Sequence, residues 1–293
     1  MNILSDAMNI AYQLMDSFAF LVLSALGLAI IFGMMGIVNL AHGEFIMLGA
    51  YITTLLARAG VPLPIAIAGA AAAVGVFGLI VDRLIVRHLY NRPLDSVVAT
   101  WGISLILGQG MLILMGPSLQ GVSTPLGSFT VDGSAYSYYR IVLFVCALAL
   151  LLMMYWLFMH TNFGLRSRAT MQNRAVAQSL GTNTSGMYTI TFMIGSAFAG
   201  LTGGLFAPTM SISPTFGSSF IMQSFVTVIV GGANPLVGTV LSGGALSAVN
   251  STLSMLYGTL IGKLGLLLVA ILFIRVFPLG FSGLVEKKWL RGR

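Results

Sequence analysis

Long apolar runs recur along the whole chain and are separated by short polar segments. A helix needs roughly 20 mostly apolar residues to cross the hydrocarbon layer of a bilayer. About eight or nine runs approach this length, at residues 18–38, 40–56, 63–81, 97–115, 141–159, 187–207, 220–230, 236–256 and 264–277. The pattern therefore predicts an all-α, polytopic membrane helix bundle that forms a single transmembrane domain over residues 1–293.

The stretch GIVNLAHGEFIMLG, residues 36–49, interrupts the apolar pattern with Asn39, His42 and Glu44. An ionisable side chain at the bilayer centre costs about 2.5 to 3.5 kcal/mol on insertion scales, so such residues usually face the bundle interior or a wet cavity. We expect a broken or re-entrant helix here. Two readings stay open and are compatible: the polar side chains satisfy the backbone of the break, with Glu44 near the positive end of the next helix, or they line a path for a polar solute.

A second interruption is VGGANPLVGTVLSGG, residues 230–244, where Asn234 and Pro235 lie between glycine pairs. Proline lacks a backbone donor and disfavours helix at the residue before it. Interrupted segments at similar places in two halves of a chain are typical of transport pathways built from internal repeats. Asn234, with Asn250 in the following apolar run, would hydrogen-bond a neutral solute without leaving a counter-charge unpaired.

Composition and charge place the chain in a membrane. It is 57% hydrophobic and 7% charged, against roughly 25% charged residues in soluble proteins. Although the net charge is +7, the cations lie at the ends of apolar runs and not along one soluble face, which argues against nucleic-acid binding. The three clusters are Arg83, Arg87 and Arg92; Arg166, Arg168 and Arg174; and Lys287, Lys288, Arg291 and Arg293.

The same distribution predicts an orientation. Basic clusters favour the cytoplasmic side, whereas the loop 116–139 has Asp132 and no Lys or Arg and is expected outside. The N-terminus is then periplasmic and the C-terminus cytoplasmic. The first fifteen residues contain Asp6 and no Lys or Arg, so we expect no cleavable signal peptide. The single cysteine, Cys146, lies in an apolar run and excludes an intrachain disulfide.

Motifs for catalysis are missing from the sequence. The segment HGEF around His42 lacks the second histidine of a zinc protease helix, and no glycine-rich loop ends in Lys-Ser or Lys-Thr to hold phosphates. We therefore expect no metal site, no cofactor and no enzyme activity in this chain. Any ATP and Mg²⁺ would be held by separate subunits.

The loop 163–187, FGLRSRATMQNRAVAQSLGTNTSGM, is the most informative polar segment of the chain, and it contains three arginines. A short amphipathic helix is predicted from about Thr170 to Leu180, ended by Gly181. On the cytoplasmic face it would either lie on lipid headgroups or dock into a soluble partner.

Several separate stretches carry a resemblance that covers nearly the whole chain. They are GLAIIFGMMGIVNLAHGEFIMLGAY, NRAVAQSLGTN, FMIGSAFAGLTGGLF, VIVGGANPLVGT and LFIRVFPLGFSGL. Together they resemble the permease family of ABC importers for branched-chain amino acids, urea and short amides. The resemblance implies an inner-membrane permease that works with a second related permease, two ABC ATPase subunits and a periplasmic solute-binding protein.

The resemblance also implies roles for individual residues. The loop 163–187 would hold the cytoplasmic coupling helix that engages the ATPase, and the matching positions are Arg174, Ala175, Ala177, Leu180 and Gly181. Gln178 and Ser179 depart from the broader motif, in which an acidic residue is common.

The choice of solute depends on finer motifs. ATWGISLILGQG, residues 99–110, and RATMQNRAVAQSLG, residues 168–181, look closer to the urea and short-chain amide permeases. We expect urea or a small amide first and branched-chain amino acids next. The alternative is a stand-alone channel or an ion-coupled carrier that uses His42 and Glu44, in which case the polar cytoplasmic helix would have no purpose.

Overall fold

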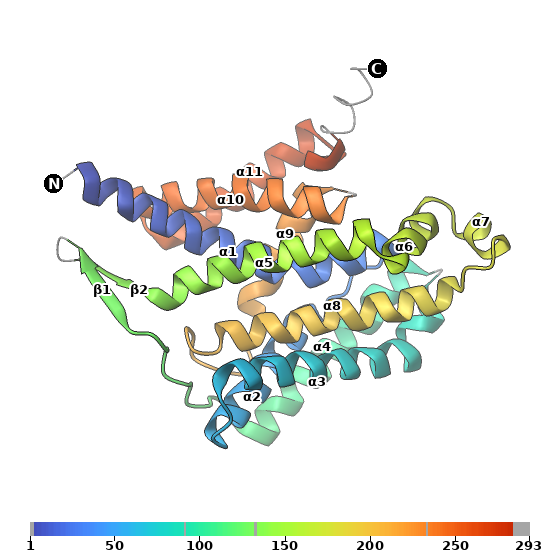
Figure 1. Cartoon of the computed structure of the whole chain (residues 1–293), viewed down its shortest axis with the longest axis horizontal. Helices are drawn as coiled ribbons and strands as arrows, with labels where there is room; N and C mark the ends of the chain where they lie inside the picture. Colours follow the sequence, from blue (N-terminus) through green and yellow to red (C-terminus); the bar gives the residue numbers. More distant parts are fainter. Residues whose placement is uncertain (1–2, 91, 132–133, 233, 284–293) are drawn as a thin grey trace. The chain divides into compact units, whose positions relative to one another are not determined.

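The computed structural model describes residues 3–90, 92–131, 134–232 and 234–283, and within them it is built almost wholly of helices (Figure 1). The predicted all-α membrane bundle is therefore confirmed. The helices are α1 (Ile3–Met35), α2 (His42–Arg58), α3 (Leu63–Leu84), the 3-10 helix η1 (Val86–Leu89), α4 (Pro93–Met115), α5 (Tyr138–His160), α6 (Asn162–Gln172), α7 (Arg174–Ser179), α8 (Thr184–Phe206), α9 (Ser218–Gly231), α10 (Pro235–Tyr257) and α11 (Thr259–Val276).

Six helices in these ranges are long and apolar enough to cross a membrane: α1, α3, α4, α5, α8 and α11. The predicted runs 40–56 and 220–230 correspond to α2 and α9, which are only 17 and 14 residues long. α10 has 23 residues, but Ser, Thr and Asn are interleaved with its apolar side chains. Asp132 and the basic residues 287–293, which the predicted orientation uses, lie outside the described residues.

The chain divides into two compact units. Unit 1 comprises residues 1–25, 124–152 and 223–293, and unit 2 comprises residues 26–123 and 153–222. In unit 2, α8 packs closely against α2 and α3. Glycines permit this approach: a Cβ built on Gly200 would collide with Val74 of α3, and one built on Gly203 would collide with the Ile46 carbonyl of α2. The small residues of α8 thus lie at helix contacts, where small side chains let two helix backbones approach closely.

Unit 1 has an apolar core formed by parts of α1, α9, α10 and α11, with Leu21, Val230, Leu246, Leu266 and Ala270. Strands β1 (Ser128–Val131) and β2 (Ser134–Ser137) form an antiparallel hairpin in which Ser128 pairs with Ser137. The hydropathy pattern did not indicate this hairpin. It is held to α1 by the Tyr12 hydroxyl, which donates to the Ser137 carbonyl at 3.0 Å.

One local prediction is wrong. The single helix expected from Thr170 to Leu180 is two helices, α6 and α7, which are separated at Asn173. Asn173 has an extended backbone (φ −155°, ψ 105°), and its side-chain oxygen accepts a hydrogen bond from the Val176 N–H at 3.1 Å. An asparagine that caps a helix start competes with the helix before it, and here that competition ends α6.

Candidate functional site

The first helix break lies in unit 2, between α1 and α2. Gly36 follows α1 with a left-handed φ of 66°, a conformation that glycine adopts readily. Asn39 is fully buried, and its Oδ1 accepts a hydrogen bond from the Ala41 N–H at 3.1 Å. The Asn39 carbonyl accepts a second bond from the His42 N–H at 3.3 Å. Asn39 therefore supplies acceptors to backbone groups that no helix satisfies.

Thr100 of α4, which the sequence analysis did not select, closes the same break. The Leu40 N–H donates to the Thr100 hydroxyl oxygen at 3.1 Å, and this hydroxyl lies 2.9 Å from the Ser96 carbonyl, to which it donates. A threonine inside an apolar helix commonly bonds to its own preceding turn. This local hydrogen bond does not indicate a partner 60 residues away in the sequence. The contact between Thr100 and Leu40 is therefore visible only in the folded chain.

His42 is the first residue of α2 and is wholly buried. A Cβ built on Gly27 of α1 would lie 3.0 Å from the His42 Cε1 and would also collide with the Gly195 carbonyl of α8. The glycine at position 27 therefore makes room for the imidazole beside a tight contact of α1 with α8. This packing supports the reading in which His42 stabilises the break.

Glu44 lies in the first turn of α2, where the positive end of the helix dipole favours a carboxylate. Ser104 of α4 hydrogen-bonds to this half-buried carboxylate. Two other atoms of the break, the Glu44 Oε2 and the Asn39 Nδ2, are buried and have no hydrogen-bond partner among the described residues. Buried polar atoms are nearly always paired with protein, water or a ligand, so these two are available to a polar molecule.

The second helix break lies in unit 1, between α9 and α10. Gly232 has a φ of 87°, and α10 begins at Pro235. The Asn234 N–H donates to the Ser282 Oγ at 3.3 Å, and the Asn234 Oδ1 accepts from the Val237 N–H, also at 3.3 Å. Asn234 thus caps α10, in the position where proline and asparagine commonly start a helix.

Asn250 lies farther along α10 and does not take part in this second break. Its Nδ2 donates to the Ser17 Oγ of α1 at 2.9 Å, whereas its Oδ1 is buried without a partner in the described chain. The structure therefore brings Asn39, His42 and Glu44 together around one helix start, and it places Asn250 at a separate helix contact of unit 1.

The predicted coupling residues lie on and just after α7, beside the start of α8 in unit 2 (Figure 1). Ala177 is buried, whereas Ala175 and Leu180 are exposed, Leu180 by 80%. Gly181 has a φ of 85° and ends the segment, as its sequence position predicted. Arg174 is half-buried at the first position of α7. The stretch thus presents both an anchored side and an exposed apolar side.

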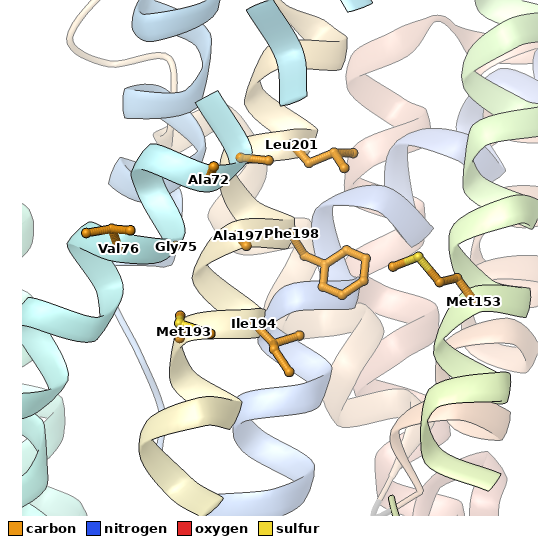
Figure 2. A pocket seen from close by; sticks show the side chains of 10 residues that line it. Ala72, Gly75, Val76, Met153, Met193, Ile194, Ala197, Phe198 and Leu201 are labelled. Atoms are coloured by element: carbon orange, nitrogen blue, oxygen red, sulfur yellow. The ribbon is translucent and has the colours of Figure 1, made fainter. Parts of the chain in front are cut away.

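A cavity of about 380 Å³ lies between α3, α5 and α8 in unit 2 (Figure 2). Its walls are apolar and include Val76, Met153, Met193, Ile194, Phe198 and Leu201. None of the predicted site residues contributes to it. A pocket without polar groups cannot orient a polar solute, so the cavity is not the candidate site.

These features define the class of protein: a multi-pass membrane protein with broken helices and a polar segment between two of its apolar helices. In the part of the chain that the structure describes, no three His, Cys, Asp or Glu side chains gather to hold a metal ion. Residues 10–277 match the family model of the permease component of branched-chain amino acid transport systems. The chain belongs to this family, and it is a permease subunit of an ABC importer and not an enzyme.

Individual relatives agree with this assignment. The chain is 27% identical, over 284 residues, to the high-affinity branched-chain amino acid permease BraD of Pseudomonas aeruginosa, covering 90% of this chain and 92% of BraD. It is 29% identical to a probable branched-chain amino acid permease, LivH, of Methanocaldococcus jannaschii, covering 92% and 91%. A more distant relative is the autoinducer 2 permease LsrD of Salmonella paratyphi B, 28% identical over 75% of this chain and 65% of LsrD. No solved structure matches the chain.

Proposed function

We propose that this chain is one of the permeases through which an ABC importer takes up branched-chain amino acids. The observation that carries the proposal is the match to BraD and LivH, relatives with that description that align with about nine-tenths of the chain. The expectation of urea or a short amide depended on residues 99–110 and 168–181 alone, and these relatives do not support it.

The chemistry of the first helix break favours an amino acid over urea. A zwitterion carries an ammonium group that needs an acceptor and a carboxylate that needs donors. The Glu44 Oε2 is an available buried acceptor, and the Asn39 Nδ2 is an available buried donor. The N–H groups of urea can also donate to a carboxylate, but urea has no positive charge to pair with it and no carboxylate to accept from the amide. Asn39 and Glu44 are therefore the residues that we assign to solute contact, with His42 and Thr100 supporting them.

The importer would contain a second, related permease, two ATPase subunits that hold ATP and Mg²⁺, and a periplasmic solute-binding protein. We place the α6–α7 loop in the cytosol, where its arginines follow the positive-inside rule. Val176 and Leu180 of this loop are 52% and 80% exposed, which leaves apolar surface for an ATPase to cover. Closure of the ATPases would then move α7 and switch access to the path.

The solute is tested by uptake into proteoliposomes. The complete importer is assembled from this chain, its partner permease, its ATPases and its solute-binding protein, and uptake of radiolabelled leucine and urea is compared with and without ATP inside the vesicles. We expect ATP-dependent uptake of leucine that excess isoleucine suppresses. ATP-dependent uptake of urea would overturn the solute, and uptake by this chain without its ATPases would overturn the importer mechanism in favour of a channel or carrier.

The docking surface is tested by replacing Leu180→Asp and measuring how much ATPase copurifies. A charge at the centre of an apolar contact typically weakens it by at least about tenfold. The matched control is Leu165→Asp on α6, where the leucine is 61% exposed and lies outside the predicted coupling residues. Equal ATPase yields from the two variants would show that α7 is not the docking helix.

A further inference from the structure

Asp82 is a carboxylate buried at the end of a membrane-spanning helix. It belongs to the last turn of α3 and is 0% exposed. The Tyr90 hydroxyl lies 2.7 and 2.9 Å from its two oxygens, and Thr189 of α8 also hydrogen-bonds to it. Arg83 and Arg87 provide positive charge nearby. This carboxylate therefore joins α3 to α8 and to the turn after η1.

Aromatic contacts extend this polar cluster to α7. The ring of Tyr90 meets the ring of Tyr188 edge to face, with centroids 5.0 Å apart. The Arg174 guanidinium lies 5.2 Å from the centroid of the Tyr188 ring, within the roughly 6 Å reach of a cation–π interaction. Contacts thus run without a gap from Arg174 through Tyr188 and Tyr90 to Asp82, and we call these four residues the α7–α3 link.

The Tyr90 hydroxyl is protonated in the α7–α3 link, as its hydrogen bond to Asp82 requires. Burial raises the pKa of Tyr90, and the Asp82 carboxylate acts in the same direction. The Tyr90 hydroxyl therefore keeps its proton and donates to Asp82 at neutral pH. Tyr188 is 8% exposed and packs with Met34 and Met187, so its ring is held in place between the two contacts.

The backbone on both sides of α7 is not helical, so a movement of α7 can reach α8 only through side-chain contacts. α7 has six residues, with extended backbone at Asn173 before it and a left-handed Gly181 after it. Because non-helical residues flank this short helix, its backbone cannot transmit a displacement to α8 as a continuous helix would. Contacts from its side connect it to α8: Arg174 on Tyr188, and the Gln178 Nε2, which donates to the Thr184 Oγ1 at 2.8 Å.

We propose that the α7–α3 link transmits the movement of the coupling helix to the membrane-spanning helices α3 and α8, with Tyr188, Tyr90 and Asp82 as positioning residues. The inference deepens the proposed function and rests on it. Because α8 also packs against α2 and α3, a displacement of Tyr188 would reach the helices around the first break. Tyr188, Tyr90 and Asp82 make ATP hydrolysis productive but do not bind the ATPase themselves.

The test separates ATPase docking from coupling, using the whole importer in proteoliposomes. Tyr188→Leu removes the ring, Tyr188→Phe keeps it, and Phe198→Leu is a control that removes another buried aromatic ring of α8. ATPase copurification, ATP hydrolysis and leucine uptake are measured for each. We expect Tyr188→Leu to retain its ATPase and to lower the uptake per ATP by about tenfold, within the usual range of coupling between distant sites, with Tyr188→Phe and Phe198→Leu near wild type.

An unchanged uptake per ATP in Tyr188→Leu would overturn the link, and so would an equal loss in Phe198→Leu. If Tyr188→Leu does not fold, Tyr90→Phe gives the same test, because it removes only the hydroxyl that donates to Asp82; wild-type coupling in that variant would overturn the link. A wild-type chain that captures no ATPase would instead overturn the proposed function.

Discussion

The two helix breaks resemble each other in sequence but are built differently. The break between α1 and α2 is closed by side chains from elsewhere in the fold, since Thr100 of α4 accepts from Leu40 and Ser104 bonds to Glu44. The break between α9 and α10 relies more on local features, with Gly232 at a φ of 87° and the Asn234 cap on Val237, and its contact from elsewhere in the fold is the long bond from the Asn234 N–H to Ser282. Polar residues at a helix break therefore do not by themselves indicate a solute path. Among the residues that the structure describes at the two breaks, only those of the first include both a carboxylate and a buried amide donor without a partner.

The largest loss of stability is expected when a side chain is added where two backbones touch beside the first break. A Cβ on Gly43 would lie 2.7 Å from the Gly217 carbonyl oxygen, whereas one on Gly244 of α10 would meet nothing within 4 Å. We expect Gly43→Ala to destabilise the protein by about 2 to 3 kcal/mol, as overpacking does, and Gly244→Ala to be neutral or stabilising by up to about 1 kcal/mol. Thermal unfolding in detergent measures both, and equal melting temperatures would contradict the contact.

Thr100→Val should have the next largest effect, because it keeps the shape of the side chain and removes the acceptor for the Leu40 N–H. A buried donor left without a partner costs about 1 to 3 kcal/mol. Thr100→Ser retains the hydroxyl and serves as the control. The same unfolding measurement applies, and a Val variant as stable as the Ser variant would show that the hydroxyl does not support the break.

Replacing the asparagine of each helix break by alanine compares how much the two asparagines contribute to the stability of the protein. Asn39→Ala leaves the buried Ala41 N–H without its acceptor, at a cost of about 1 to 3 kcal/mol. Asn234→Ala removes a cap from the exposed Val237, and loss of such a cap costs about 1 kcal/mol. We expect the larger drop in melting temperature for Asn39→Ala, and the reverse order would show that the second break depends more on side chains.

The smallest effect is expected for Ser282→Ala. The Asn234 N–H donates to Ser282 at 3.3 Å, a long bond of a kind whose net contribution is about 0.5 to 1 kcal/mol. Glycine conformations should keep the second break in place without it. A destabilisation as large as that of Thr100→Val, measured in the same unfolding assay, would mean that both breaks are closed by side chains.

The sequence alone determined the class of fold and most of the helix limits, because these depend on local properties. The length of an apolar run sets whether a helix can cross a bilayer, and Gly36, Pro235 and Gly181 end or start helices through their own backbone preferences. The capping asparagine at 173 was equally local, but its side chain competes with a helix that composition favours, and the break after α6 was missed.

Only the tertiary structure decided which polar residues meet. Thr100 lies 60 residues from the backbone group it accepts from, and Arg174 reaches Asp82 through two tyrosines on separate elements. The hydropathy pattern does not predict such pairs. The sequence around a buried threonine or aspartate has the same hydropathy whichever partner forms its hydrogen bond. The packing of helices from different parts of the chain sets those pairings, since burial leaves each polar group only the partners within hydrogen-bonding distance.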